Sequence, residues 1–238
     1  SAAFGTMSFL CGLALVFVLQ IVPRGVPPFD RSETAVQRIK AGLNFVFSKQ
    51  IIIASIAMDL FAVFFGGAVA LMPVFAKDIL HVGPQGAGIL RASMAVGAIT
   101  MAIFLAHRPL GKNAGKIMLF CVAGFGLCNI FFGLSTNFYL SCLLLLAAGM
   151  FDEVSVFIRS ALVQFQTPEN MKGRVSSVSS IFITSSNELG AFESGLAARL
   201  MGTVSSVVFG GVMTLGVVAF TWWKAPKLRN YDFEGHTS

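Results

Sequence analysis

The chain has 238 residues, of which 55% are hydrophobic and only 12% are charged. A soluble domain carries about 25% charged residues, so this chain has too few to cover a water-soluble globule. Together with a mean hydropathy of +0.79, the composition excludes an ordinary soluble protein and indicates a membrane protein.

Seven apolar segments are long enough to cross a bilayer, which takes about 20 helical residues. In chain order they cover residues 3–22, 51–76, 87–106, 117–134, 138–163, 175–199 and 204–223. Apolar helices satisfy their own backbone hydrogen bonds in lipid, so the fold class that we predict is all-α, a polytopic helical bundle.

A polar stretch, residues 23–50, separates the first span from the other six. It opens with PRGVPP, whose prolines prevent a continuous helix. Ser32 is a candidate cap for the helix that follows. In the run AVQRIKAGLNFVF, an apolar stripe with helical spacing consists of Val36, Ile39, Leu43 and Phe47. These features predict an amphipathic helix that lies along the membrane surface.

Basic residues alternate from one connection between spans to the next. Thirteen of the seventeen Lys and Arg residues fall on one side: Arg24, Arg31, Arg38, Lys40, Lys49, Arg108, Lys112, Lys116, Lys172, Arg174, Lys224, Lys227 and Arg229. The positive-inside rule makes that side cytoplasmic. Because the charge follows the connections and forms no continuous stripe, it is a topology signal and not a nucleic-acid-binding surface.

This topology divides the chain into four predicted parts. Residues 1–22 form the last span of an amino-terminal half, 23–50 a cytoplasmic linker with an amphipathic helix, 51–223 a carboxy-terminal six-helix bundle and 224–238 a cytoplasmic tail. Transporters made of two halves join them by a long linker of this kind. The chain has no initial Met and enters an apolar segment directly, so we expect the amino-terminal half to lie upstream.

Two strings carry a resemblance to a known family. They are DLFAVFFGGAVALMPVFAKDILHVGPQGAGILRASMAVGA (59–98) and TPENMKGRVSSVSSIFITSSNELGAFESGLAA (167–198). From about residue 41 to the tail, the chain resembles bacterial transporters of the major facilitator superfamily, in the branch of the enterobactin exporter and related drug-efflux proteins. The loop HRPLGKNAGK (107–116) is similar to a loop motif of that superfamily but lacks its acidic residue, which argues against a gating role.

The resemblance implies a function as well as a fold. A transporter of this branch exports a small organic compound, such as a drug or a siderophore-like molecule, across the bacterial inner membrane. The implied mechanism is proton-driven antiport.

Eight ionisable residues fall inside the predicted spans: Asp59, Arg91, Asp152, Glu153, Arg159, Glu188, Glu193 and Arg199. Each costs about 2.5–3.5 kcal/mol at the centre of a membrane helix, so each is a functional candidate. Arg91 and Arg199 lie near the outer ends of their spans and are expected to reach the headgroups. Arg159 is expected to pair with a carboxylate on a neighbouring helix, either to orient helices or to gate transport. Glu193 is expected to serve helix packing or an outer gate.

Proton coupling needs a carboxylate that takes up and releases a proton in each cycle. Asp152, Glu153 and Glu188 lie near the midplane, and Asp59 lies about nine residues into its helix, so all four are candidates. The adjacent Asp152 and Glu153 point about 100° apart, so at most one faces a central cavity directly. Asn187 belongs to the polar patch TSSNELG around Glu188, which must face protein or water.

Two features of the second span are less specific. Gly66, Gly67 and Pro73 allow a bend like those in transporter helices, although close packing alone also uses glycine. Phe61, Phe64 and Phe65 are suited either to a pocket for a flat apolar substrate or to contact with lipid.

The sequence contains no enzyme signature. There is no GxxxxGK[ST] loop, and the three histidines and four cysteines show no metal-ligand spacing, so we expect no enzyme, cofactor or metal site.

The leading hypothesis is a secondary transporter that works by alternating access, with a small molecule, protons and the lipid bilayer as partners. The alternatives are an uptake transporter of the same fold, a membrane-embedded lipid-modifying enzyme and a non-transporting scaffold. Only the resemblance favours export over uptake.

Overall fold

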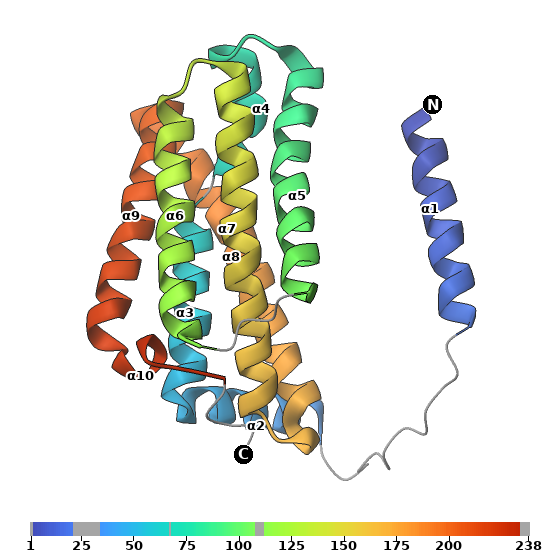
Figure 1. Cartoon of the computed structure of the whole chain (residues 1–238), viewed down its shortest axis with the longest axis vertical. Coiled ribbons are helices and arrows are strands. Elements are labelled where there is room, and N and C mark those ends of the chain that lie inside the picture. Colours follow the sequence, from blue (N-terminus) through green and yellow to red (C-terminus); the bar gives the residue numbers. More distant parts are fainter. Residues whose placement is uncertain (1, 21–33, 67, 108–111, 234–238) are drawn as a thin grey trace. The chain divides into compact units, whose positions relative to one another are not determined.

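The computed structural model describes residues 2–20, 34–66, 68–107 and 112–233 of the chain. Within them every regular element is helical (Figure 1). The elements are α1 (Ala2–Leu19), α2 (Ala35–Ser48), α3 (Gln50–Phe65), α4 (Ala68–Val74), the π-helical turn η1 (Phe75–Ile79), α5 (Gly83–His107), α6 (Ala114–Leu134), α7 (Phe138–Gln166), the 3₁₀ turn η2 (Glu169–Met171), α8 (Lys172–Met201), α9 (Thr203–Lys224) and α10 (Pro226–Arg229). The predicted all-α class is confirmed.

The chain forms two compact units, Ser1–Gln37 and Arg38–Ser238. The first contains α1, whose described side chains are exposed and mostly apolar. This is typical of a helix that contacts lipid or packs against other helices. The PRGVPP segment and the basic residues Arg24, Arg31 and Arg108 lie outside the described residues.

Helix α2 begins at Ala35 and is capped by Thr34. The Gln37 N–H donates to Thr34 Oγ1 (3.3 Å), and the Thr34 N–H donates to Gln37 Oε1 (2.8 Å). This reciprocal pair is a capping box. The structure shows the cap at Thr34, which has a glutamine at the right spacing, and the predicted cap Ser32 lies outside the described residues.

Five helical segments among the described residues are long and apolar enough to cross a membrane: Gln50–Ile79, Gly83–His107, Ala114–Leu134, Phe138–Gln166 and Thr203–Lys224. Each overlaps one predicted span. Helix α8 has 30 residues but is too polar to count among them, because serines, Asn187 and two glutamates interrupt its apolar sequence. The chain is thus a multi-pass membrane protein in which one long helix is unusually polar.

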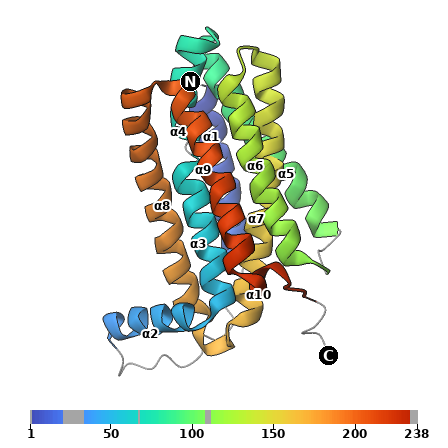
Figure 2. The ribbon, with the colours of Figure 1, turned by 90° about the vertical axis from the view of Figure 1, so that its left-hand side faces the viewer.

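The long helices of the second unit pack side by side (Figures 1 and 2). Helix α5 lies against α7, α6 lies between α7 and α9, and α3 lies between α8 and α9. Small residues permit this proximity: a Cβ at Gly97 of α5 would overlap the Leu146 carbonyl of α7, and a Cβ at Gly149 of α7 would overlap the Met94 carbonyl of α5. In lipid, such close van der Waals packing is a main source of helix association.

The second predicted span is interrupted, as its glycine and proline residues allow. Helix α3 ends where the Gly66 N–H donates to the Ala62 carbonyl (2.8 Å). Helix α4 then begins at Ala68, contains Pro73 and passes into η1. Gly66 also serves packing, because a Cβ there would lie 2.9 Å from the Phe125 ring. The predicted Gly67 lies outside the described residues.

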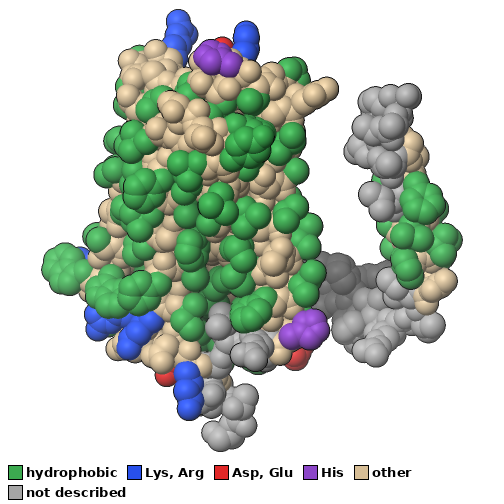
Figure 3. All heavy atoms as spheres, turned by 45° about the horizontal axis from the view of Figure 1, so that its top comes forward, with side chains coloured by type: hydrophobic (Ala, Val, Ile, Leu, Met, Phe, Trp, Pro, Cys, Tyr) green, Lys and Arg blue, Asp and Glu red, His purple; other side chains and the backbone are tan. Residues whose placement is uncertain are grey.

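Basic side chains gather at one end of the second unit, which we call the basic end. It is made by the start of α3, the start of α6, the connection from α7 to α8 and the end of α9 (Figures 1 and 2). Its described basic residues are Lys49, Lys112, Lys116, Lys172, Arg174, Lys224, Lys227 and Arg229. Figure 3 shows hydrophobic side chains over the flank of this unit and charged ones near its ends, as expected for a protein that spans a bilayer.

The tail folds back onto the basic end. Tyr231 is buried, and its carbonyl accepts a hydrogen bond from the Gly115 N–H (3.1 Å). The Asn113 N–H donates to the Asp232 carboxylate, and Phe233 contacts Phe165. Asp232 therefore places a negative charge at the start of α6, where the helix dipole favours it, beside a loop that has no acidic residue of its own.

Replacing Gly97 by Ala should weaken the contact between α5 and α7. The added Cβ meets the Leu146 backbone, which cannot move aside as a side chain does. We therefore expect the free energy of unfolding to fall by about 1–3 kcal/mol. Gly88→Ala on the same helix is the control, because a Cβ there meets nothing within 4 Å. Thermal unfolding in detergent measures both variants, and equal unfolding midpoints would contradict the packing described.

Candidate functional site

An ion pair joins α3 to α7 inside the helix bundle. Arg159 Nη2 lies 3.2 Å from Asp59 Oδ2, and the two side chains are only 7% and 8% exposed. A charge in this position is costly unless a partner of opposite sign lies beside it. Asp59 is therefore the carboxylate that the sequence led us to expect beside Arg159. The pair fixes the rotation of both helices about their axes.

A cleft lies between α7 and α8. Among the described residues these two helices barely touch, and α3, which contacts both, forms the floor between them. Two cavities of 480 and 470 Å³ open along this cleft. Both volumes fall within the range of about 300–1,000 Å³ that is typical of small-molecule sites.

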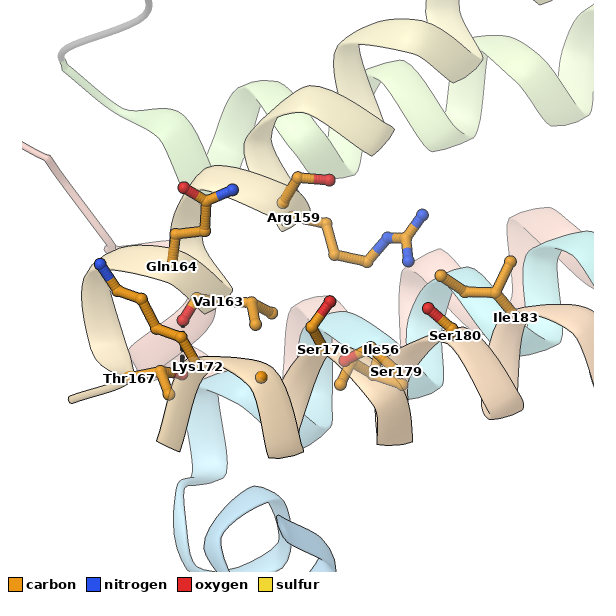
Figure 4. A pocket seen from close by; sticks show the side chains of 12 residues that line it. Ile56, Arg159, Val163, Gln164, Thr167, Lys172, Ser176, Ser179, Ser180 and Ile183 are labelled. Carbon is orange, nitrogen blue, oxygen red and sulfur yellow. Dashed lines mark hydrogen bonds between the residues drawn. The ribbon is translucent and has the colours of Figure 1, made fainter. Parts of the chain in front are cut away.

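The first cavity lies toward the basic end, and its walls are mainly α7 and α8 (Figure 4). Arg159 extends into it from α7, and Ser176, Ser179 and Ser180 lie on the α8 wall. Arg159 Nε and Ser179 Oγ are buried and have no hydrogen-bond partner among the described residues. Buried polar atoms normally have one, so these two groups are suited to bind a polar molecule.

The second cavity holds the candidate Asp152. It is lined by Asp152 from α7, Asn187 from α8 and Arg91 from α5, together with apolar residues such as Met94 and Phe125. One acid, one base and one amide thus converge in a largely apolar hollow, which is the usual composition of a binding site.

Arg91 is a residue of this cavity that the sequence did not reveal. We expected it to reach the headgroups because it lies near the outer end of its span. Arg91 is exposed and also lines the hollow that contains Asp152. The position of a residue along a span cannot show the direction in which a long side chain turns. The positive charge of Arg91, opposite to that of Asp152, was a usable signal that the two residues share a cavity.

Helix α8 presents two different exposed surfaces. Polar residues follow one another at spacings of three and four along one of them, the polar stripe: Ser176, Ser180, Thr184 and Asn187. The other surface is mainly apolar and also contains the exposed Ser185; its apolar residues are largely exposed: Ile181, Leu189, Phe192 and Leu196. The polar stripe borders both cavities of the cleft, since Ser176 and Ser180 line the first and Asn187 the second.

The patch TSSNELG is divided among three environments. Ser186 is buried and donates a hydrogen bond to the Leu60 carbonyl (2.6 Å). Asn187 lines the second cavity, and Glu188 is exposed at the border between the two surfaces of α8.

The remaining candidates lie elsewhere. Glu153 is half-buried and points about 100° away from Asp152 around α7. Glu193 is half-buried and accepts a hydrogen bond from Ser194 Oγ (3.4 Å). Within the part of the chain that the structure describes, no group of three His, Cys, Asp or Glu residues is placed to hold a metal ion.

Comparison with known proteins supplies a family. A family model described as a transmembrane secretion effector matches residues 1–237. The enterobactin exporters EntS of Shigella flexneri and Citrobacter koseri are 25% identical to the chain over 199 residues, which is 83% of the chain and 47% and 48% of those relatives. The chain therefore spans about half the length of the curated relatives that it matches. No solved structure matches it significantly.

Replacing either member of the Asp59–Arg159 pair should destabilise the bundle. Asp59→Leu or Arg159→Met leaves one buried charge without its partner, and each should lower the free energy of unfolding by about 3–5 kcal/mol. The double variant should lose much less free energy of unfolding than the sum of the two single losses, because neither buried charge remains. Thermal unfolding in detergent measures all three.

The control for this cycle is Lys172→Gln. Lys172 pairs with Glu169, a residue whose side chain is 89% exposed, so its loss should have little effect. Additive losses in the double variant would show that Asp59 and Arg159 do not depend on each other.

Proposed function

The chain belongs to the major facilitator superfamily, in its transmembrane secretion effector family, and from this membership we propose that it forms one wall of a secondary active transporter that exports a small organic compound. The observation that carries the proposal is the cleft between α7 and α8, where Asp152, Arg91 and Asn187 line one cavity. Transporters of this kind bind their substrates near the bilayer midplane, between two halves.

The polar stripe of α8 supports a second wall. Ser176, Ser180, Thr184 and Asn187 are exposed in this chain, and in lipid the Asn187 amide would lack partners, whereas Ser and Thr hydroxyls can also bond to their own helix. Water or another helical bundle must therefore cover the stripe. The matched relatives are about twice as long as the region they share with this chain, so a second bundle of the same protein is the natural partner.

Asp152 is the proposed proton carrier. It lines a cavity, so water or substrate can reach its carboxylate, whereas the Asp59 carboxylate is occupied by Arg159. Glu188 is the second candidate, because it lies at the edge of the polar stripe and would face the partner bundle. Glu153 is the third candidate for the proton carrier, because it points away from Asp152.

The ion pair and the glutamate near the outer end of α8 have proposed supporting roles. Arg159 reaches the first cavity while paired with Asp59, so a substrate anion that competes for the guanidinium would loosen α3 from α7. This makes Arg159 a gating candidate. Glu193 is half-buried with Ser194 as its partner, which suits packing at the outer gate.

The basic end is the proposed cytoplasmic end. By the positive-inside rule, the linker, the connection from α7 to α8 and the tail face the cytoplasm, in a bacterial inner membrane. Alternating access would then open the cleft first at the basic end and next at the opposite end, as this bundle rocks against its partner.

Export, rather than uptake, is proposed because the matched relatives are named as exporters. Uptake by the same fold would use the same cleft. A lipid-modifying enzyme would need His, Asp or Glu residues clustered at one membrane interface, whereas Asp152 and Asp59 lie within the bundle on different helices.

Asp152→Asn should abolish proton-driven transport. The test uses proteoliposomes of the full-length protein, an imposed pH gradient, and ethidium and enterobactin as probes. We expect gradient-driven movement of at least one probe in the wild type and only background movement in Asp152→Asn, because an amide cannot carry the proton. The control Glu169→Gln removes an exposed acid at the basic end and should transport normally. A pH response that survives in Asp152→Asn combined with Glu188→Gln would refute the coupling assignment.

A further inference from the structure

A groove separate from the cleft lies between α3 and α9. It has a volume of about 480 Å³, and its walls are almost entirely apolar: Ile53, Ala57, Phe61 and Phe65 from α3, and Met213, Gly216, Val217 and Phe220 from α9. Its polar side chains, Gln50, Thr221 and Lys224, belong to the residues nearest the basic end. We propose that this groove binds one acyl chain of an anionic phospholipid whose phosphate is held by Lys224.

The groove faces away from the transport cleft. Ile53, Ala57 and Phe61 are spaced by four residues and share one face of α3. Asp59 belongs to the opposite face, which is buried toward Arg159. Phe61 and Phe220 are both largely exposed, at 47% and 62%. In the proposed arrangement the partner bundle covers the side of the cleft, which leaves this face to the bilayer, so a molecule that enters from the bilayer is the occupant with direct access.

The groove is long enough to span one leaflet. It follows α3 from Gln50 to Phe65, which is about 22 Å at 1.5 Å per residue. The hydrocarbon of one leaflet is about 15 Å thick. An acyl chain lying along α3 would therefore remain within the groove from the headgroup level to the middle of the bilayer.

Two tryptophans place Lys224 at the level of the headgroups. Trp222 and Trp223 lie in the last turn of α9, immediately before its final residue Lys224, and tryptophan is enriched at membrane interfaces. Lys224 lines the groove at this end, and its Nζ lies 4.5 Å from the Trp223 ring centroid. Lys49 precedes Gln50 at the same end and adds a second positive charge.

These charges favour an anionic headgroup. Basic residues at this depth attract acidic lipids of the cytoplasmic leaflet, which is the leaflet at the basic end in the topology proposed above. The lack of polar groups farther along the groove favours an acyl chain over a transported compound with polar substituents. Phe61 and Phe65 of α3 suit either a substrate pocket or contact with lipid. The proposal assigns both of them to lipid.

The test is native mass spectrometry of the full-length protein with two probes of equal chain length, palmitoyl-oleoyl phosphatidylglycerol and palmitoyl-oleoyl phosphatidylcholine. The wild type should retain phosphatidylglycerol in preference to phosphatidylcholine. Lys224→Gln should reduce that preference about five-fold, the factor expected for one basic residue at an anionic surface. Lys227→Gln is the matched control, because Lys227 is exposed on α10 and does not line the groove.

A second variant tests the groove itself. A Cβ at Gly216 meets nothing within 4 Å, so Gly216→Leu should fill the groove without disturbing the helices and should reduce retention of both lipids. Gly88→Leu on α5, whose Cβ also meets nothing, should leave lipid retention unchanged.

Three results would overturn the proposal: equal lipid preference in Lys224→Gln and Lys227→Gln, wild-type lipid retention in Gly216→Leu, or displacement of the bound phospholipid by ethidium. The last result would assign the groove to a transported compound. None of these readouts depends on proton coupling, so the proposal can fail or hold independently of the proposed function.

Discussion

The hydrocarbon of a bilayer offers no hydrogen-bond partners, and this constraint decides where each polar side chain of the bundle lies. Arg159 is paired with Asp59, and the Ser186 hydroxyl donates to the Leu60 carbonyl. Thr214 donates to the Gly210 carbonyl of its own helix (2.9 Å). Beside these satisfied groups, the polar stripe of α8 is a continuous set of exposed polar side chains next to the two cavities. The surface that lipid cannot cover is thus the surface to which we assign transport.

Helix α3 separates two different environments. On one face Asp59 fastens it to α7 at the floor of the cleft, and on the opposite face Phe61 and its neighbours line the apolar groove beside α9. Beyond the interruption at Gly66, α4 lines the second cavity through Pro73.

The helices were predictable, because long apolar runs in lipid can form little else, and the break in α3 followed from glycine and proline. The rotation of each helix about its axis was harder to predict from the sequence. Sequence spacing showed that Asp152 and Glu153 diverge, but only the packing of α7 against α5 shows that Asp152 lines the cavity. The partner of Arg159 and the direction of Arg91 depend on residues far apart in the chain. Thr34 was missed as the cap of α2 because Ser32 offered the same chemistry two residues earlier.

The central claim is that the polar stripe of α8 faces a water-filled pathway and that the opposite exposed surface faces lipid. The direct measurement is labelling of single cysteines by a membrane-impermeant maleimide in the full-length protein, in a background where Cys11, Cys121, Cys128 and Cys142 are replaced by Ala. Thr184→Cys should react, and a transported compound should slow the reaction. Phe192→Cys, about 12 Å farther along α8 on the apolar surface, should remain unlabelled. Labelling of Phe192→Cys but not of Thr184→Cys would contradict the account.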